Sequence, residues 1–375
     1  MIRRICYLTG TRADFGLMAS TLRAIEADRR LDLQLIVTGM HLSDRYGGTI
    51  ADIEAEGFAI AGRVAVDPDD VSAASMAINI GRMLQGFVPA LQEMNPDILL
   101  LLGDRGEMLA GAIAGIHLGI PVAHLHGGER SGTVDEPVRH AISKLAHLHL
   151  VATAQARDRL VRMGERADAV HVVGAPGVDG LFETKRSNRA TLCAEVGFDP
   201  ALSIGLLVFH PVLQEADSAS EQIRAVLKAA QGMQVLALMP NSDAGSDCVR
   251  QVLSEAASSG SLKLRTHLRR DEYIGWMACC DVLFGNSSSG IIEAASFGTP
   301  VVNIGTRQNL RERNVNIQDV PAEVVAVEAA LKAALNHGRY PTTNVYGDGQ
   351  AGRRIVELLA TAPLTSNLLS KCNVY

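Results

Sequence analysis

Short, continuously apolar segments alternate with longer amphipathic segments along almost the whole chain. Because the short segments are apolar throughout rather than at every second residue, they predict parallel strands that are covered on both faces. They are residues 5–10, 33–39, 98–104, 122–128, 148–153, 170–176, 204–211, 235–240, 262–268, 282–286 and 301–305. The amphipathic pattern of helices occurs between them, at residues 104–118, 135–146, 216–231 and 322–338. This alternation predicts an α/β fold built on parallel sheets.

The alternation of strand and helix occurs twice, and a polar stretch at about residues 176–203 separates the two halves. A chain of 375 residues is also too long for one hydrophobic core. We therefore expect two Rossmann-like, doubly wound domains, residues 1–180 and 181–350, followed by a C-terminal helix and tail, residues 351–375. Two such sheets that face each other form a cleft at the carboxyl ends of their strands.

Composition narrows the class of protein. Hydrophobic residues make up 47% and charged residues 20% of the chain, as in a globular enzyme. The net charge is −6 and no stripe of Lys and Arg occurs, which argues against a nucleic-acid partner. No segment approaches the ~20 apolar residues of a membrane helix, so no membrane partner is expected. The six cysteines are scattered without a CxxC pair, which favours reduced thiols in a cytoplasmic protein.

The polar, glycine-containing motifs all follow predicted strands. One of them, GNSSSG at residues 285–290, follows a predicted strand and combines two glycines with three serine hydroxyls. This composition predicts a diphosphate-binding turn at the start of a helix near Ser288 or Ser289. In this interpretation Gly285 and Gly290 provide backbone conformations that other residues avoid. The alternative is an ordinary helix with a serine N-cap.

Three further residues favour the phosphate site. Glu293 is expected in the first turn of the helix, where its carboxylate would bind the ribose hydroxyls, and Arg307 in the motif GTRQ would add a positive charge. Arg12 follows the first strand and would reach the same phosphates across the cleft. An alternative for Arg12 is a pair with Asp14 at a helix start.

Acidic residues and histidines gather at two other strand ends. Asp104 and Arg105 follow one strand, and the next strand leads into HLHGGERSGTVDEPVRH, residues 124–140. This segment holds His124, His126, Glu129, Asp135, Glu136 and His140. Several acids beside histidines in one cleft suit proton transfer at carbon. Taken alone, Asp104 would more simply cap the next helix.

These histidines have other interpretations besides proton transfer. His124 and His126 lie two apart, as do His147 and His149, but the chain has no HExxH motif and no cysteine beside them, so no metal is expected. His210 in FHPV would face the acids of the first domain, with a core histidine as the alternative. A serine nucleophile is disfavoured because the chain has no GxSxG motif.

Together, TGTRADFG, GDRGEMLAGA, the segment 124–153, FHPV, PNSDAGS, GNSSSGIIEAASFGTP and NIGTRQ resemble the hydrolysing UDP-N-acetylglucosamine 2-epimerases of sialic acid synthesis. The similarity runs from residue 1 to about residue 350, with the motifs in the same order. It implies two Rossmann-like domains in the glycosyltransferase-B arrangement, the first with the acid/base residues and the second binding UDP.

The resemblance also implies a role for single residues. The implied acid/base and sugar-site residues are Asp104, Asp135 and His210, and we expect His126 to support them in catalysis. The implied substrate-binding residues are Arg12, Asp179, Asn241, Ser287, Ser288, Glu293 and Arg307. Their neighbours in the same motifs, Arg105, Glu129, Ser289 and Gly290, are expected to bind substrate as well. Many relatives have Glu where His126 stands, and this leaves the identity of the second base open.

The implied reaction removes the C2 proton as UDP leaves C1, giving a 2-acetamidoglucal that water then hydrates to N-acetylmannosamine. It needs no cofactor and no metal. The same reaction on UDP-2,4-diacetamido-2,4,6-trideoxyglucose, of the legionaminic acid pathway, stays open, as do a UDP-sugar glycosyltransferase and a non-catalytic sensor of nucleotide sugars. A homodimer or homotetramer is expected from the resemblance alone.

Overall fold

The first half of the chain forms a sheet of seven parallel strands. The computed structural model describes residues 2–67, 72–131, 135–183, 186–241 and 243–374. The strands of this sheet are β1 (Arg3–Thr9), β2 (Leu31–Thr38), β3 (Ile60–Val64), β4 (Ile98–Leu102), β5 (Val122–Leu125), β6 (Leu148–Val151) and β7 (Val170–Val172). Their order is β3-β2-β1-β4-β5-β6-β7, so the winding direction reverses between β1 and β4.

The second half forms a sheet of six parallel strands with the same kind of reversal. Its strands are β8 (Ile204–Val208), β9 (Gln234–Leu238), β10 (Lys263–Arg265), β11 (Val282–Gly285), β12 (Val301–Ile304) and β13 (Ile317–Val320). Their order is β10-β9-β8-β11-β12-β13, and the reversal lies between β8 and β11. Ligands of open α/β sheets bind where the strand order reverses, so each sheet offers one such place.

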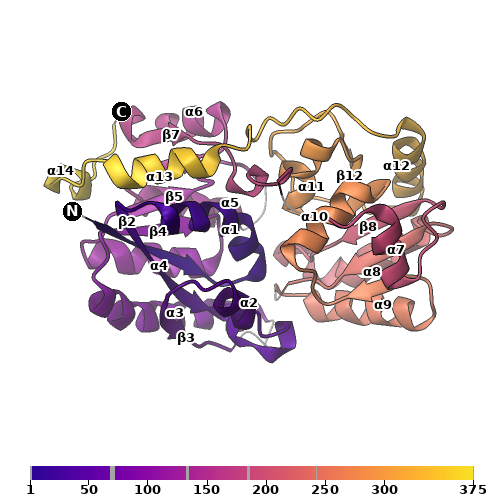
Figure 1. Cartoon of the computed structure of the whole chain (residues 1–375). Helices are drawn as coiled ribbons and strands as arrows, with labels where there is room; N and C mark the ends of the chain where they lie inside the picture. The colour runs from indigo at the N-terminus through magenta and orange to yellow at the C-terminus, as the bar shows by residue number, and fades with distance from the viewer. Residues whose placement is uncertain (1, 68–71, 132–134, 184–185, 242, 375) are drawn as a thin grey trace.

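Helices cover both faces of each sheet, and the two layered lobes lie side by side (Figure 1). The helices of the first half are α1 (Arg12–Ala27), α2 (Ile50–Ala55), α3 (Ala73–Met94), α4 (Gly106–His117), α5 (Asp135–Leu145) and α6 (Ala154–Arg162). Those that follow are α7 (Arg189–Val196), α8 (Ala219–Ala229), α9 (Ser246–Ser258), α10 (Arg270–Cys279), α11 (Ser288–Ile292), α12 (Val324–His337), α13 (Ala351–Thr361) and α14 (Ser366–Leu369).

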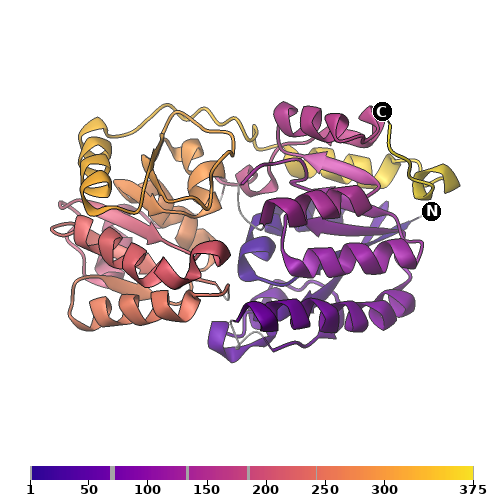
Figure 2. The ribbon, with the colours of Figure 1, turned by 180° about the vertical axis from the view of Figure 1, so that it is seen from behind.

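The core of each lobe is the apolar face of its helices against the strands. On the first sheet, α1 and α13 pack on one face, while α3, α4 and α5 pack on the other, which faces the viewer in Figure 2. On the second sheet, α8, α9 and α12 cover one face, and α7 and α10 cover the other. This two-sided burial explains why most strands are apolar throughout.

The last long helix, α13, belongs to the first lobe although the chain reaches it from the second. Ile355 and Leu359 of α13 are buried in the core that also contains Leu22 and Ile25 of α1. Figure 1 shows the chain crossing back from α12 to α13, so that both ends of the chain lie at the first lobe. The amphipathic pattern of residues 351–361 fits a helix but does not say which sheet it covers.

The predicted α/β fold with two parallel sheets is confirmed, and each predicted strand corresponds to one observed strand. Two strands, β3 and β13, were missed. Both lie at the edge of a sheet and are only partly buried, so they lack the continuous apolar sequence by which the others were predicted. Within the described part of the chain, no helix is both long and apolar enough to cross a bilayer. The six cysteines, all of them described, are free thiols.

Candidate active site

The predicted site motifs follow the strands at which the winding of each sheet reverses. In the first sheet, Arg12 comes shortly after β1 and Asp104 shortly after β4. In the second sheet, His210 comes shortly after β8 and Ser287 shortly after β11. Because the carboxyl ends of neighbouring parallel strands lie together, each sheet brings its two motifs to one place.

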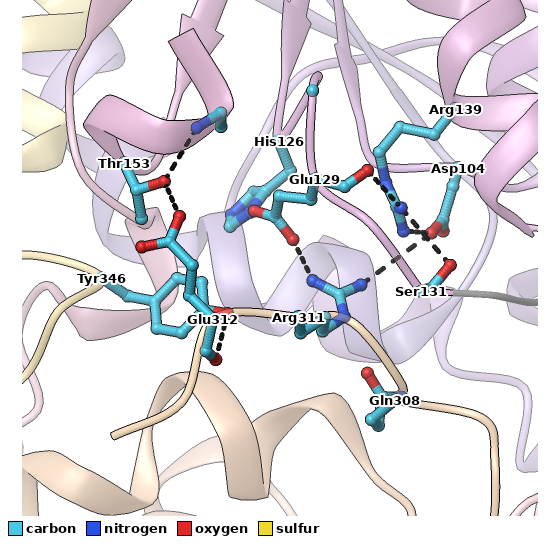
Figure 3. A network of polar contacts seen from close by, with 12 residues as sticks. Asp104, His126, Glu129, Ser131, Arg139, Thr153, Gln308, Arg311, Glu312 and Tyr346 are labelled. Carbon is cyan, nitrogen blue, oxygen red and sulfur yellow. Dashed lines mark hydrogen bonds and ion pairs between the residues drawn. The ribbon is translucent and has the colours of Figure 1, made fainter. Parts of the chain in front are cut away.

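Asp104 is held by two arginines from different lobes (Figure 3). Arg139, a fully buried residue of α5, donates to Asp104 and also to the backbone carbonyl of Glu129, at 3.1 Å. Arg311, from the loop after β12, lies 4.0 Å from the same carboxylate. Asp104 is thus bound by buried arginines of both lobes, and it does not cap α4, which has no side-chain cap.

A second buried carboxylate, Glu129, lies between His126 and Arg311. Its Oε1 is 2.5 Å from Nδ1 of His126, and its Oε2 accepts from Arg311. Burial alone would raise the pKa of Glu129, but Arg311 and His126 lower it below its usual value. His126 follows β5 in the left-handed backbone region, with φ of 60°. This conformation turns its ring away from the strand and toward Glu129.

Asp135 is the first residue of α5 and lies near arginines of both lobes. Burial would lower the pKa of Arg105, but Glu107, Asp243 and Asp135 raise it above its usual value. Burial lowers the pKa of Arg307, and Asp135 opposes this shift. Residues 132–134 of the GTVDE motif lie outside the described residues. Asp135 therefore lies close enough to Arg105 and Arg307 to interact with both charges.

His210 contacts its own lobe and faces arginines rather than the acids of the first lobe, contrary to the sequence-based expectation. Its Nδ1 accepts from the backbone N–H of Asn241 at 3.3 Å. Burial and the positive charges of Arg307 and Arg12 lower its pKa to about 3, although Asp243 opposes them. The imidazole is thus neutral at pH 7, with Nε2 as its proton-bearing nitrogen.

Asn241 and Asp243 join this group to the first lobe. The side-chain amide of Asn241 donates to Asp243 at 2.7 Å, and Asp243 accepts from Arg105 across the cleft at 3.3 Å. The buried Oδ1 of Asn241 has no hydrogen-bond partner among the described residues. A buried amide oxygen without a donor is costly, and it is available to a ligand.

The serine turn adopts the predicted geometry. Helix α11 begins at Ser288, and Ser287 is its N-cap. Gly285 has φ of 122°, and a Cβ at this position would lie 2.1 Å from the carbonyl oxygen of Val208, so only glycine fits. Ser289 is hydrogen-bonded to Ser287 at 2.8 Å and to the hydroxyl of Tyr273. The turn thus presents hydroxyls and the first N–H groups of a short helix.

Two details of this motif differ from expectation. Gly290 has ordinary helical geometry, and its small size matters instead because a Cβ would lie 3.0 Å from Leu283 and 3.1 Å from Val301. Glu293 is the C-cap of the five-residue α11 rather than a first-turn residue. Its buried carboxylate is paired with Arg270, which also donates to the carbonyl of Gly177 at 2.9 Å.

Arg12 makes no hydrogen bond or ion pair with any other described residue, and its Nη1 is buried without a partner. Asp14, the alternative partner, instead caps α1 and accepts from Thr9 and Thr11. Burial and the positive charge of Arg250 lower the pKa of Arg12 to about 10, although Asp52 opposes them. A half-buried guanidinium without an anion is unfavourable by itself, so this place suits an anionic ligand.

Asp179 has a structural partner in the described chain. Its two carboxylate oxygens accept from the backbone N–H groups of Ala351, at 2.9 Å, and Gly352, at 2.5 Å. These are the first residues of α13, so Asp179 caps the helix that returns to the first lobe. Burial raises the pKa of Asp179 above its usual value, with the two N–H groups opposing that shift.

Sequence reasoning missed four residues of the site: Arg139, Arg270, Tyr273 and Arg311. Arg139 lies four residues after Asp135, and this i,i+4 spacing places both on one side of α5. Arg311 carries no such signal, because it stands among the similar residues of RQNLRER. Only the contact between the lobes distinguishes it.

The paired histidines have protein partners of their own in the first lobe. His126 lies beyond β5, so His124 and His126 do not share a strand face. His124 contacts the hydroxyl of Ser143 at 3.1 Å, and His149 contacts Glu165 at 3.0 Å. Over the described ranges, no group of three or more His, Cys, Asp or Glu side chains is arranged to hold a metal ion.

Comparisons with known proteins identify a family that the chain resembles over most of its length. A family model described as UDP-N-acetylglucosamine 2-epimerase matches residues 23–360. The chain is 50% identical to the UDP-N,N′-diacetylbacillosamine 2-epimerase (hydrolyzing) of Legionella pneumophila, over the whole length of both. It is 33% identical to a UDP-N-acetylglucosamine 2-epimerase of Neisseria meningitidis, over 93% of this chain and 92% of the relative.

Among solved structures, the UDP-GlcNAc 2-epimerase from Neisseria meningitidis bound to UDP-GlcNAc matches with a TM-score of 0.79 at 17% identity. The match covers 95% of this chain and 99% of that chain. At this identity the likeness concerns the fold: two lobes with parallel sheets and a cleft between them.

Proposed function

Because the chain belongs to the UDP-N-acetylglucosamine 2-epimerase family and is a hydrolysing UDP-sugar 2-epimerase, we propose that its substrate is UDP-2,4-diacetamido-2,4,6-trideoxyglucose, that is, UDP-N,N′-diacetylbacillosamine. The relative named for this sugar shares 50% of its residues over the full length, whereas the relative named for UDP-N-acetylglucosamine shares 33%. The comparisons thus favour UDP-2,4-diacetamido-2,4,6-trideoxyglucose, which the sequence left open as an alternative, over UDP-N-acetylglucosamine as the substrate.

One observation supports the chemistry most strongly: carboxylates of the first lobe meet arginines of the second. Asp104 lies beside Arg311, and Asp135 lies in the field of Arg307. Two acids in a largely buried, positively charged cleft suit removal of a weakly acidic proton from carbon and its return to the other face.

We assign the first half-reaction to these groups. One carboxylate, Asp104 or Asp135, takes the proton from C2, and the C2–H electrons form the C1=C2 double bond as the bond from C1 to the UDP oxygen breaks. Arg12, the serine turn and Arg307 stabilise the charge that develops on the departing diphosphate. The product in the site is the 2-acetamidoglucal with a further acetamido group at C4.

The second half-reaction adds water across the double bond. A protonated carboxylic acid gives its proton to C2 on the face opposite to the one that lost it, the water oxygen attaches to C1, and the proton that this water loses returns to that carboxylate. The carboxyl group that took the C2 proton in the first half-reaction releases it to solvent. His126 and neutral His210 assist as hydrogen-bonding groups. The sum is UDP-sugar plus water giving UDP and the free 2,4-diacetamido-2,4,6-trideoxymannose, with no electron transfer and so no need for a redox cofactor.

UDP-N-acetylglucosamine is the second candidate. The relative from Neisseria meningitidis, which covers nearly the whole chain, is named for it. With this substrate the products would be UDP and N-acetylmannosamine, the precursor of sialic acid. The two sugars differ at C4 and C6, so the groups that contact these positions decide between them.

The test is proton NMR in deuterated water with each sugar in turn and no added metal. We expect free UDP and a 2-epimeric sugar carrying deuterium at C2 from the diacetamido-trideoxy substrate, at a kcat/KM at least tenfold above that for UDP-N-acetylglucosamine. A reversed preference would establish the sialic acid reaction. Turnover of neither sugar, with UDP still bound, would favour a glycosyltransferase or a nucleotide-sugar sensor.

Three further properties belong to the same proposal. The six free thiols suit the cytoplasm. The partners are small nucleotide sugars, with neither nucleic acid nor membrane. The assembly is a homodimer or homotetramer, which light scattering of the purified protein would test.

A further inference from the structure

A buried carboxylate outside the cleft is surrounded by three basic side chains. Glu165 is 3% exposed and follows α6. Its Oε1 is 2.7 Å from Lys144 of α5, and its Oε2 is 3.0 Å from His149 of β6 and 2.7 Å from Lys371. These partners hold the pKa of Glu165 at about 2 although burial opposes the shift. Lys371 comes from the segment near the C-terminal end of the chain, which runs past α6 (Figure 1).

Lys371 also binds the carboxyl end of α5. Its ammonium donates to the backbone carbonyls of Ser143, at 2.9 Å, and Ala146, at 2.6 Å. The last carbonyls of a helix lack partners within the helix, and a cation there also interacts favourably with the helix dipole. A second bond holds the segment in place: the N–H of Val374 donates to Gly164 at 2.9 Å.

The helix that Lys371 binds is the one that carries the site. Asp135 is its first residue, and Arg139, one turn later, binds Asp104. The hydroxyl of Ser143 donates to the carbonyl of Arg139 at 3.0 Å and contacts His124. His124 in turn lies 2.7 Å from the carbonyl of Gly103, the residue before Asp104. Helix α5 is thus tied to Asp104 through Arg139. Its carboxyl end is tied both to the turn that carries Asp104, through Ser143 and His124, and to Lys371.

We propose that Lys371 is a positioning residue for the epimerase reaction: by holding the carboxyl end of α5, it sets the position of Asp135 and Arg139 relative to Asp104. The proposal rests on the proposed function for the roles of Asp135 and Asp104. A helix moves as a rigid rod, so a shift at one end moves the groups at the other. A displacement of about 1 Å in a reacting group costs up to about a hundredfold in rate.

The geometry separates this role from simple stabilisation. When Lys371 is replaced, Glu165 keeps Lys144 and His149, so no buried charge is left without a partner and the lobe remains folded. The contacts that disappear are the ion pair with Glu165 and the hydrogen bonds to the carbonyls of Ser143 and Ala146 at the carboxyl end of α5. The serine turn lies in the other lobe and is untouched.

The experiment compares Lys371→Met with Lys371→Arg, which keeps the charge and the donors, and with Cys372→Ser at the exposed neighbouring position. We expect Lys371→Met to lower kcat about tenfold, with KM and the Kd for UDP within about twofold of the wild type. Lys371→Arg should recover most of kcat, and Cys372→Ser should match the wild type. Hydrogen exchange of the amides of residues 138–146 should accelerate in Lys371→Met and not in the other two variants.

Two results would overturn the proposal. One is an unchanged kcat and unchanged amide exchange in Lys371→Met. The other is a loss of kcat accompanied by equal losses of UDP affinity and melting temperature, which is the pattern of a residue needed only for folding. If the wild type turns over neither sugar, accelerated exchange confined to residues 138–146 in Lys371→Met still supports the tie between Lys371 and α5, and the proposed function alone fails.

Discussion

The two sides of the cleft differ in whether their charged side chains are paired within the protein. On the carboxylate side, formed by Asp104, Glu129 and Asp135, negative charges are answered by arginines, as in the contact of Glu129 with Arg311. On the phosphate side, formed by the serine turn and Arg12, the turn is neutral, and the side chain of Arg12 makes no ion pair with a described residue. Arg12 lowers the pKa of His210, which is hydrogen-bonded to Asn286 beside the turn.

This difference matches two tasks of one reaction. A group that removes a proton from carbon must remain charged in a dry site before the substrate arrives, and paired arginines allow this. A group that receives a departing diphosphate must have positive charge and donors still unused, since a ligand cannot displace a built-in carboxylate without loss. The following changes break one side while leaving the other intact.

The largest effect is expected from Asp135→Asn. Because the amide cannot take or return a proton, kcat should fall by about a thousandfold, the range seen when general acid–base groups are lost. UDP should still bind with a Kd near that of the wild type, since the phosphate side is unchanged. The measurements are turnover by NMR and UDP affinity by calorimetry.

Asp158→Asn is the matched control, because Asp158 is an exposed aspartate of α6 that pairs with the neighbouring Arg157 and has no role in the proposed site. It should behave as the wild type in both assays. If Asp135→Asn retained full turnover, Asp135 would have no part in proton transfer, and Asp104 would have to act alone or with His126.

The next effect is on stability and comes from Arg311→Met. Arg311 and Glu129 are both nearly buried, with 9% and 5% of their side chains exposed. Removing one partner of a buried pair leaves an uncompensated charge, at a cost of about 3 kcal/mol in the free energy of unfolding. Chemical denaturation at pH 7.5 and pH 4.5 measures it.

The pH dependence of this loss has a definite sign. In the wild type the pKa of Glu129 is depressed, so its contribution to stability is present above its unfolded pKa and is lost as the pH falls through the folded value. Without Arg311, burial raises that pKa, and the deficit of the variant should shrink as the pH falls from 7.5 to 4.5. Equal deficits at both pH values would mean that Glu129 is not the affected group. Arg269→Met, at a side chain 73% exposed, is the control and should change stability by less than about 1 kcal/mol.

The sequence predicts the strands well because parallel strands buried on both faces carry a continuous apolar signal. It fails at the partly buried edges, β3 and β13, where tertiary pairing rather than composition makes the strand. The return of α13 to the first lobe was likewise unpredictable, because an amphipathic helix specifies that it is covered and not by which sheet.

The residues of the site likewise fall into a group that the sequence predicts and a group that it does not. Asp104, His210 and the serine turn were predictable because they follow strands, and the carboxyl ends of parallel strands converge. Arg311 and Lys371 were not predictable, because each forms an ion pair with a residue far away in sequence. Arg311 pairs with Glu129, and Lys371 pairs with Glu165. Asp179 shows the converse, since the family resemblance placed it among the substrate-binding residues while its carboxylate caps α13.

A moderate effect is expected from Arg12→Met on the phosphate side. One charge-assisted contact to the diphosphate is worth about 2 kcal/mol, so the Kd for UDP should rise roughly thirtyfold. Stability should stay unchanged or increase slightly, because Arg12 gives up no partner within the described chain. Calorimetry at two salt concentrations should also show a weaker salt dependence of UDP binding in the variant.

Arg166→Met is the control, because it removes an exposed arginine, 56% accessible, and should leave UDP binding unchanged. Unchanged UDP affinity in Arg12→Met would assign that guanidinium to something other than the diphosphate.

The smallest effect separates two neighbouring serines of the turn. The hydroxyl of Ser288 makes no hydrogen bond to another described residue, whereas that of Ser289 is bonded to Ser287 and Tyr273. Ser288→Ala should therefore weaken UDP binding about fivefold, the value of one neutral hydrogen bond, without changing the melting temperature. Ser289→Ala should do the reverse, lowering the melting temperature by a few degrees while UDP affinity changes less. If both variants lost stability and neither lost affinity, the turn would be a structural helix cap, and the backbone N–H groups with Arg12 would have to bind the diphosphate without the serine hydroxyls.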